Sequence, residues 1–420
     1  MTNNKKWYKL DNAAKIVPST RYGADTRVFR ICCELNEKVD AQILQHALDK
    51  TICEFPHFNC ILKKGLFWYY LEASNKKVKV CEEHLPPCSA IYTGRKKDLL
   101  FRLQYYKKRI NLEMFHVLTD GTGAFVFMKS IVINYLIECH QLDESIIPKE
   151  CSSISEKIGD AFNHFYEKNK KKIWLKEKML KKAYYLKGER NKNLALQLLE
   201  GTVSVRKLLE VAHQYNTTIT IFSVAVYIES IIKTMAAREK KIPIGITIPV
   251  NLRNYFPSHT TRNFFGVINV LFQPSHYDGT LESIIKEMKQ VFKAQLSAEK
   301  MFHMMNFYVA LEHNWALKVV PLFLKDLVIA GINCLIQHRI TSTISNLGMI
   351  KMPEKLLPYI DKFSSFMATN TVQICISSFQ DALTFGVASA FKTHSFLMYF
   401  FRRLVDLGIS VELSATDYDI

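Results

Sequence analysis

One short segment of the 420-residue chain combines the residue types that proton-transfer chemistry needs. Residues 115–123 read Phe-His-Val-Leu-Thr-Asp-Gly-Thr-Gly, between an apolar run that predicts a strand and a longer one that predicts a helix. The neutral imidazole of His116 is available as a base near pH 7, because histidine has a reference pKa of about 6.5. Asp120 can fix this imidazole or hold the loop through an ion pair, and Gly121 allows a turn that other residues resist. The segment therefore predicts a general base on a strand-to-helix loop.

A purely structural reading fits the same spacing, with His116 as a hydrogen-bonded residue in an ordinary turn. Other catalytic templates are absent, since the sequence holds no GxxxxGK[ST], GxSxG or HExxH motif. The ten cysteines are scattered without a CxxC pair, and no Cys/His spacing is typical of a zinc site. We therefore expect reduced, packed thiols and no metal.

Hydrophobic patterning predicts an α+β chain with mixed sheets in both halves. The predicted strands cover residues 28–35, 58–62, 66–71, 99–106, 110–115, 242–250, 265–272, 371–379, 383–390 and 409–413. The predicted helices cover residues 39–54, 124–139, 203–215, 221–237, 281–298 and 396–407.

The composition fits a folded chain of two domains. Hydrophobic residues make up 48%, which excludes a disordered chain, and the length exceeds what a single core usually supports. Residues 156–193 are crowded with lysine and interleaved with aromatic residues, which indicates a basic helical connector or a solvated helix face. We expect an N-terminal domain over residues 1–165, a connector over 166–195 and a C-terminal domain over 196–420.

The apolar run tested for membrane insertion, residues 327–336, has about half of the ~20 residues that span a bilayer. The basic start of the chain has no apolar segment behind it, unlike a signal peptide. We therefore expect a cytoplasmic protein.

Residues 116–121 resemble the HxxxDG signature of the acyl-CoA-dependent acyltransferase superfamily, which includes chloramphenicol acetyltransferase and condensation domains. Three later segments resemble those of its alcohol acetyltransferase branch and follow in the expected order: Pro-Val-Asn-Leu-Arg at 249–253, Arg-Asn-Phe-Phe-Gly at 262–266 and Ser-Asn-Leu-Gly at 345–348. Residues 10–15 also resemble bacterial members, so the resemblance covers nearly the whole chain. Phe115 stands where many members have a first histidine, and the DFGWG segment of the plant branch is absent.

The resemblance implies two chloramphenicol-acetyltransferase-like domains, each a two-layer α/β sandwich, with a channel between them. It implies that His116 is the general base, that Gly121 belongs to the catalytic motif, and that Asp120 is structural and pairs with Arg253. The resemblance implies channel-lining or oxyanion-stabilising roles for four more residues: Asn263, Gly266, Ser345 and Asn346. Two alternatives stay open here. Asn346 with Gly348 could simply form a turn, and Asn263 and Gly266 could only shape a loop near the channel.

The implied reaction moves an acyl group from acyl-CoA or an acyl carrier protein to an alcohol or amine acceptor, without a permanently bound cofactor or a covalent acyl-enzyme. Two alternatives stay open: a non-catalytic module that binds an acyl carrier or lipid, and a stand-alone condensation enzyme. The net charge of +17 attracts anions, such as a coenzyme A phosphate or an acidic carrier protein. We rank peripheral contact with an anionic membrane second among the partners, and nucleic acid last.

Overall fold

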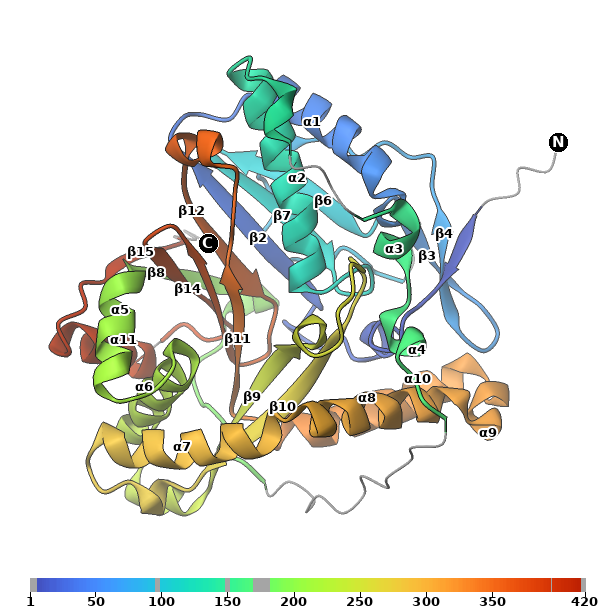
Figure 1. Ribbon diagram of the computed structural model, residues 1–420. Helices are drawn as coiled ribbons and strands as arrows, with labels where there is room; N and C mark the ends of the chain where they lie inside the picture. Colours follow the sequence, from blue (N-terminus) through green and yellow to red (C-terminus); the bar gives the residue numbers. More distant parts are fainter. Residues whose placement is uncertain (1–5, 95–98, 148–151, 169–181, 394, 417–420) are drawn as a thin grey trace.

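The computed structural model describes residues 6–94, 99–147, 152–168, 182–393 and 395–416, and these form three sheets with helices around them (Figure 1). The first half, together with β12 from the second half, builds a five-stranded sheet in the order β12-β2-β7-β6-β5, and it also builds a three-stranded sheet in the order β1-β4-β3. Their strands are β1 (Trp7–Lys9), β2 (Val28–Leu35), β3 (Cys60–Lys64), β4 (Tyr69–Ala73), β5 (Cys81–Glu82), β6 (Phe101–Tyr106), β7 (Arg109–Phe115) and β12 (Ile360–Met367).

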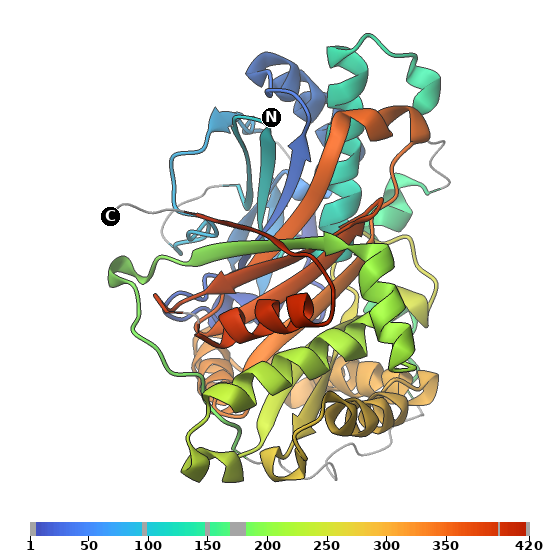
Figure 2. The same ribbon diagram turned by 90° about the vertical axis from the view of Figure 1, so that its left-hand side faces the viewer.

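The second half builds a seven-stranded sheet in the order β10-β9-β11-β13-β14-β8-β15. Helices α6 and α11 lie over one face of this sheet, as Figure 2 shows. The strands are β8 (Gln197–Ser204), β9 (Ile244–Asn251), β10 (Phe265–Phe272), β11 (Ser342–Met349), β13 (Val372–Phe379), β14 (Ala382–Ser389) and β15 (Glu412–Ala415). The α-helices of the chain are α1 (Ala41–Glu54), α2 (Gly121–Cys139), α3 (Ile154–Ile158), α4 (Ala161–His164), α5 (Val205–Gln214), α6 (Ile219–Thr234), α7 (Leu281–Gln295), α8 (Ala298–His313), α9 (Trp315–Val319), α10 (Leu322–Gln337) and α11 (Ser395–Asp406). Mixed sheets in both halves confirm the predicted α+β class.

The helices of the first half begin and pack as their sequences dictate. The side chain of Asp40 caps α1 by accepting hydrogen bonds from the backbone of Gln42 and Ile43. Helix α2 is apolar on nearly all sides and is accordingly buried around most of its circumference. It packs against α1 and helps to form the first of two hydrophobic cores.

The two large sheets meet at β12, which comes from the second half of the sequence but pairs antiparallel with β2 of the first sheet. Strand β12 also lies against β13 and β14, where the hydroxyl of Thr384 donates to the carbonyl of Phe363 at 2.8 Å. The contact is so close that a Cβ on Gly386 would lie 2.0 Å from the carbonyl oxygen of Ser365. The division into domains at residues 165 and 196 stays a prediction. The five-stranded sheet nevertheless includes β12, which lies in the range assigned to the C-terminal domain.

The predicted helical connector is wrong over residues 182–195, although α3 and α4 lie at the start of the lysine-rich stretch. Residues 182–189 are not helical, and the only helical turn within 182–195 is the short 3-10 segment Lys192–Leu194. The backbone N–H of Tyr184 instead donates to the carbonyl of Pro243 at 2.7 Å, because Tyr184 and Leu186 are buried against the second half. Residues 169–181, which carry many of the lysines, lie outside the described residues.

By length and hydropathy, α2 is the one described helix that could itself cross a membrane, and α5 with α6 qualify only as a single bent span. The sequence predicts helix α2 over residues 124–139, but the only run considered as a membrane span was residues 327–336. Because 67% of the apolar window of α2 is buried inside the protein, the helix is part of a protein core.

Candidate active site

The segment that carries His116 and Asp120 connects β7 to α2, as its pattern predicts. Asp120 is the N-cap of α2, and its Oδ1 accepts a hydrogen bond from the backbone N–H of Gly123 at 2.9 Å. The backbone N–H of His116 donates to the carbonyl of Arg27 at 3.0 Å. One end of the loop is therefore held by a backbone hydrogen bond and the other by the side-chain cap of Asp120.

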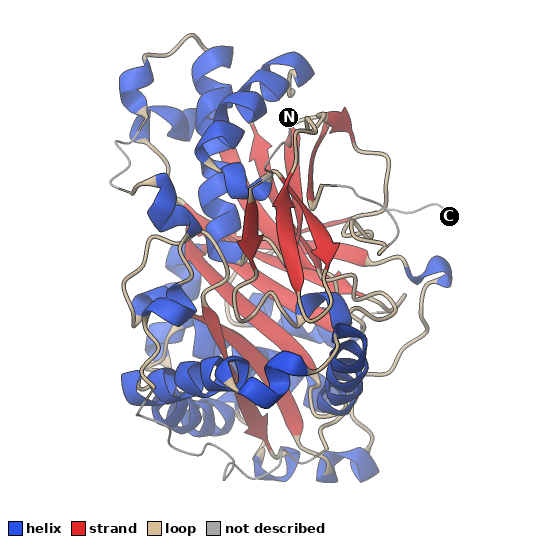
Figure 3. Cartoon of the chain, turned by 90° about the vertical axis from the view of Figure 1, so that its right-hand side faces the viewer, coloured by secondary structure: helices blue, strands red, loops and turns tan. Residues whose placement is uncertain are grey.

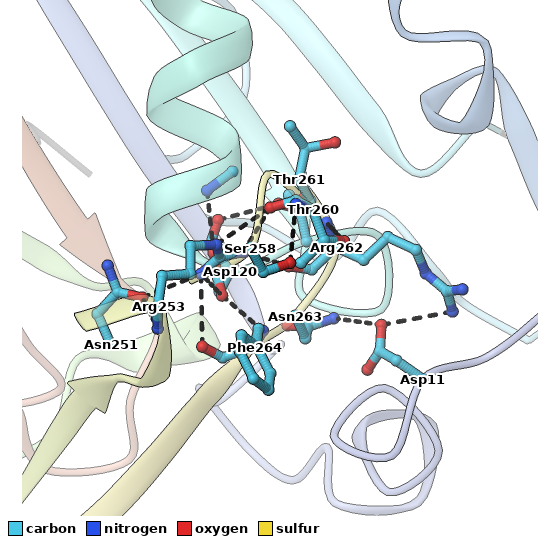
Figure 4. A network of polar contacts seen from close by, with 12 residues as sticks. Asp11, Asp120, Asn251, Arg253, Ser258, Thr260, Thr261, Arg262, Asn263 and Phe264 are labelled. Atoms are coloured by element: carbon cyan, nitrogen blue, oxygen red, sulfur yellow. Dashed lines mark hydrogen bonds and ion pairs between the residues drawn. The ribbon is translucent and has the colours of Figure 1, made fainter. Parts of the chain in front are cut away.

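A loop from the second half crosses over this segment and completes the site. It connects β9 to β10 and places residues 252–264 beside the motif (Figure 4). The backbone N–H of Phe264 donates to Asp120 Oδ2 at 2.8 Å, and the hydroxyl of Thr119 donates to the carbonyl of Thr261 at 2.5 Å. The site therefore lies where the two halves of the chain meet.

Arg253 is the central residue of the crossing loop. Its Nη1 lies 2.8 Å from Asp120 Oδ2, and its Nη2 donates to the carbonyls of Thr260 at 2.9 Å and Arg262 at 2.6 Å. The guanidinium thus fixes both the loop that contains it and the carboxylate at the start of α2. This geometry suits a structural role for Asp120, whose carboxylate is occupied by Gly123, Phe264 and Arg253.

Asn263 determines which nitrogen of His116 carries the proton. Its Oδ1 lies 3.0 Å from His116 Nδ1, while its Nδ2 donates to Asp11 Oδ2 and to the carbonyl of His116, both at 3.2 Å. The reverse orientation of the amide would set its oxygen against two acceptors. Asn263 Oδ1 is therefore an acceptor, Nδ1 of His116 carries the hydrogen, and Nε2 keeps the lone pair that a base requires.

Asp11 and Arg262 form a second layer of polar contacts next to Asn263. Asp11 is buried, accepts from the backbone N–H of Ala14 at 2.8 Å, and lies 3.5 Å from Nη2 of Arg262. Burial raises the pKa of the Asp11 carboxyl to about 6, and the nearby Arg262 opposes that rise. Sequence analysis missed Asp11 as a site residue, although it lies in the segment 10–15 that carried part of the resemblance.

His116 itself is partly buried and still reachable by solvent. Its ring packs against Phe29 and Phe265, with centroids 5.2 and 5.5 Å away. Burial lowers the pKa of His116 below its ordinary value of 6.5, while its own carbonyl, Asp120 and Asn263 partly oppose the shift. The imidazole is therefore neutral near pH 7.

The two glycines that follow Asp120 differ from the expectation. Gly121 lies in the first turn of α2 without a positive φ angle, so the predicted need for an unusual turn there is wrong. A Cβ on Gly121 would lie 2.5 Å from the end of the Leu347 side chain in β11. At Gly123, by contrast, a Cβ would lie 2.1 Å from the carbonyl oxygen of Thr261. Gly123 is thus the position that lets the crossing loop approach α2.

The structure separates the two polar candidates in β11. The side chain of Asn346 donates to the hydroxyl of Thr220 at 2.8 Å and accepts from the backbone N–H of Gly348 at 2.9 Å. Gly348 has a φ of +79°, so these contacts form the turn that was the alternative for Asn346. The hydroxyl of Ser345 has no hydrogen-bond partner among the described residues, and strand alternation puts it on the opposite face of β11.

Gly266 has a packing role in β10. A Cβ there would lie 2.1 Å from the terminal methyl of Met304 in α8. Two hollows on the described surface lie away from the motif, one beside Tyr135 and His140 and the other beside Thr217 and Lys289. The channel that the resemblance implies at His116 stays a prediction.

Comparison with solved structures identifies the fold. The chain is similar to polyketide synthase associated protein 5 from Mycobacterium tuberculosis, with 14% identity, a TM-score of 0.61, and coverage of 95% of this chain and 96% of that one. It is similar to TRI3 trichothecene 15-O-acetyltransferase from Fusarium sporotrichioides, with 12% identity, a TM-score of 0.61, and coverage of 97% and 95%. TRI101 from F. sporotrichioides, complexed with coenzyme A and T-2, has 9% identity, a TM-score of 0.63, and coverage of 97% and 99%.

No protein-family profile and no curated protein sequence matches the chain. The structural matches nevertheless cover almost the full length of this chain and of each of the three structures compared. The chain therefore has the two-domain, chloramphenicol-acetyltransferase-like fold of these structures.

Proposed function

We propose that this protein is an acyltransferase that moves an acyl group from a thioester donor, acyl-CoA or an acyl carrier protein, to an alcohol or amine. His116 is the general base. The observation that carries the proposal is the amide of Asn263, which holds the proton on Nδ1 of His116 and leaves Nε2 free to accept one.

In the proposed reaction, Nε2 of His116 takes the proton of the acceptor hydroxyl or amine as its oxygen or nitrogen attacks the thioester carbonyl carbon. The attack forms one bond and places the negative charge on the carbonyl oxygen. Collapse of this intermediate breaks the carbon–sulfur bond, and the imidazolium returns the proton to the leaving thiolate. No bond forms between the acyl group and the protein.

Ser345 is the proposed donor to the oxyanion. Its hydroxyl is unpaired among the described residues, and the neighbouring Leu347 of β11 lies against Gly121 at the start of α2. A positioned hydroxyl can contribute about 3 kcal/mol to stabilisation of an oxyanion. Asn346 is a weaker candidate, because its amide is already bonded to Thr220 and Gly348.

Two of the similar structures support the substrate class. One is a trichothecene 15-O-acetyltransferase, and another holds coenzyme A together with T-2. An O-acyltransferase of the alcohol acetyltransferase type is the form of the proposal that agrees with both the motif segments and these names.

The decisive experiment measures thiol release from acetyl-CoA, and from longer acyl-CoA, in the presence of a panel of alcohols and amines. We expect acceptor-dependent thiol release that falls by about 10²–10⁴-fold in His116→Ala, while the melting temperature stays close to that of the wild type. His84→Ala, which removes an exposed histidine, is the matched control. Saturable binding of acyl-CoA without thiol release would favour the non-catalytic binding module instead.

A further inference from the structure

The polar side of helix α10 faces the rest of the protein. Lys325 is buried, donates to the carbonyl of Phe67 at 2.9 Å, and lies 3.6 Å from the centre of the Trp68 ring. Asp326 accepts from the hydroxyls of Ser19 at 2.6 Å and Tyr69 at 2.9 Å. The polar contacts of this helix are therefore made to the body of the protein.

Asn333, two turns further along, continues the same side of α10. Its Oδ1 accepts from Arg27 at 3.3 Å, and its Nδ2 donates to the carbonyl of Thr20 at 3.4 Å. Lys325, Asp326 and Asn333 occupy one helical face because their spacing follows the 3.6-residue period. Hydrogen bonds, one buried cation and the buried Leu322 at its N-terminal end thus attach the helix to the protein, whereas most surface helices use a wide apolar stripe.

The opposite side of α10 is apolar and faces outward. No charged side chain lies among its exposed residues, and its large side chains are 42–71% exposed. They are Phe323, Leu324, Leu327, Val328, Ile332, Leu335 and Ile336. Scattered single apolar residues are normal on a surface, but a continuous stripe along four turns marks an interaction surface.

Neighbouring segments extend this stripe at its N-terminal end. The preceding helix α9 carries Trp315, 77% exposed, and Val319, 59% exposed. The tip of the β3–β4 hairpin adds Leu66, 72% exposed, whose carbonyl accepts from the backbone N–H of Leu322 at 2.8 Å. Figure 3 views the molecule from the side that carries this hairpin and the α8–α10 helices. We call α9, the outer side of α10 and this hairpin tip the apolar edge.

We propose that the apolar edge binds the surface of an anionic lipid bilayer, with α10 lying in the interface parallel to the membrane plane. The 16 residues of α10 give a helix of about 24 Å, which is too short to cross the ~30 Å hydrocarbon core. A helix that lies in the interface buries only its apolar side, about 5–10 Å deep, and leaves its polar side for contacts with the protein. This is the arrangement that α10 already has.

Charge distinguishes an anionic bilayer from a second copy of the chain. Within residues 314–340, Lys318, Lys325 and Arg339 oppose Asp326 alone, so this segment carries 3 − 1 = +2 with its histidine neutral. Asp326 is turned inward by its hydrogen bonds, whereas Lys318 is exposed on α9. Two copies at +17 each repel one another, while the cytoplasmic leaflet, which is anionic, attracts such a surface.

The test measures binding of the full chain to vesicles of phosphatidylcholine with about one third phosphatidylserine, and to vesicles of phosphatidylcholine alone. We expect sedimentation with the anionic vesicles, weaker binding to the neutral ones, and weakening by salt. Leu327→Glu with Leu335→Glu should lower the partition coefficient by about 100-fold, roughly tenfold for each leucine withdrawn from the bilayer. Both side chains point outward, so the melting temperature should stay unchanged.

The matched control replaces two exposed apolar residues of α11, Met398→Glu with Val405→Glu, at the opposite side of the molecule in Figure 1. This variant should bind vesicles as the wild type does. The proposal is overturned if the wild type stays in solution with anionic vesicles, or if the leucine variant binds them equally well. It is also overturned if the wild type is a dimer that the leucine variant dissociates without any vesicle binding. Vesicle binding needs no acyl transfer, so this result and that of the thiol-release assay stand independently.

Discussion

The guanidinium of Arg253 lies 2.8 Å from the carboxylate of Asp120, although 133 residues separate the two in the chain. Both side chains are almost fully buried, at 11% and 7% exposed. The pair joins the start of α2 in the first half to the crossing loop of the second half. Since Arg253 also bonds the carbonyls of Thr260 and Arg262, the loop that carries Asn263 depends on this ion pair for its shape.

Removal of either partner should therefore destabilise the fold. We expect Asp120→Ala and Arg253→Ala each to lower the free energy of unfolding by about 3–5 kcal/mol, because each leaves a buried charge without its partner. Denaturant unfolding measures the loss. Lys207→Ala breaks the exposed pair with Glu210 and should cost less than about 0.5 kcal/mol. An Asp120→Ala protein with wild-type stability and no activity would instead assign Asp120 to the chemistry.

Asn263 should act on the rate through the imidazole. In Asn263→Ala, Nδ1 of His116 loses its acceptor and the ring can adopt the wrong tautomer, so we expect kcat/KM to fall by about 10- to 100-fold. KM should change little if the side chain does not touch the substrate. The acid limb of the pH–rate profile should also shift, because Asn263 helps to set the pKa of His116.

A purely structural role for Asn263 predicts a different outcome. It would lower the melting temperature of Asn263→Ala and leave the pH–rate profile where it is. Gln273→Ala is a matched control, since the side-chain amide of Gln273 lies at the surface and, among the residues that the structure describes, donates to the backbone carbonyl of Lys241. That variant should keep both the rate and the profile.

The local hydrophobic pattern was sufficient to predict several strands and one hairpin between strands that are adjacent in the sequence. The strand over residues 28–35 and the strand over 265–272 coincide with β2 and β10, and the strands predicted over 371–379 and 383–390 form the β13–β14 hairpin. Strands β3 and β4 begin two and three residues after the strands predicted from residues 58 and 66. Strands β11 and β12 were missed because their partners are distant along the chain and their sequences are rich in serine and other polar residues. The helix predicted from residue 203 begins at Val205, since residues 203–204 end β8, which is paired on both sides.

The candidate site also has residues that the sequence could predict and contacts that it could not. The motif at residues 116–121 and the segment at 249–253 could be found from sequence, and the structure brings Asp120 and Arg253 together. The bond from His116 to Asn263 joins residues 147 positions apart, so no local pattern reveals it. Helix α10 was not predicted, since residues 327–336 were considered only as a membrane span, and hydropathy does not show which side of a helix faces the protein.

The lowered pKa of His116 predicts a specific pH dependence. Because burial disfavours the imidazolium, the basic form persists below the ordinary pKa of 6.5. We expect the midpoint of the acid limb of kcat/KM to lie below pH 6.5, and His116→Gln should lack this limb. The same shift favours the folded state above pH 6.5, and this contribution is lost as the pH falls, because the unfolded chain then binds the extra proton. A midpoint above 6.5 would contradict this account.

A pair of glycine substitutions tests how tightly the crossing loop packs on α2. At Gly123 an added Cβ would lie 2.1 Å from the backbone oxygen of Thr261, which cannot move without breaking its bond to Thr119. Gly123→Ala should therefore lower the free energy of unfolding by about 1–3 kcal/mol and lower activity as well. At Gly331, in α10, nothing lies within 4 Å, so Gly331→Ala should raise stability by about 0.4–1 kcal/mol through the better helix propensity of alanine. Denaturant unfolding of both variants gives the sign of each change, and equal effects at the two positions would mean that the loop does not rest on α2.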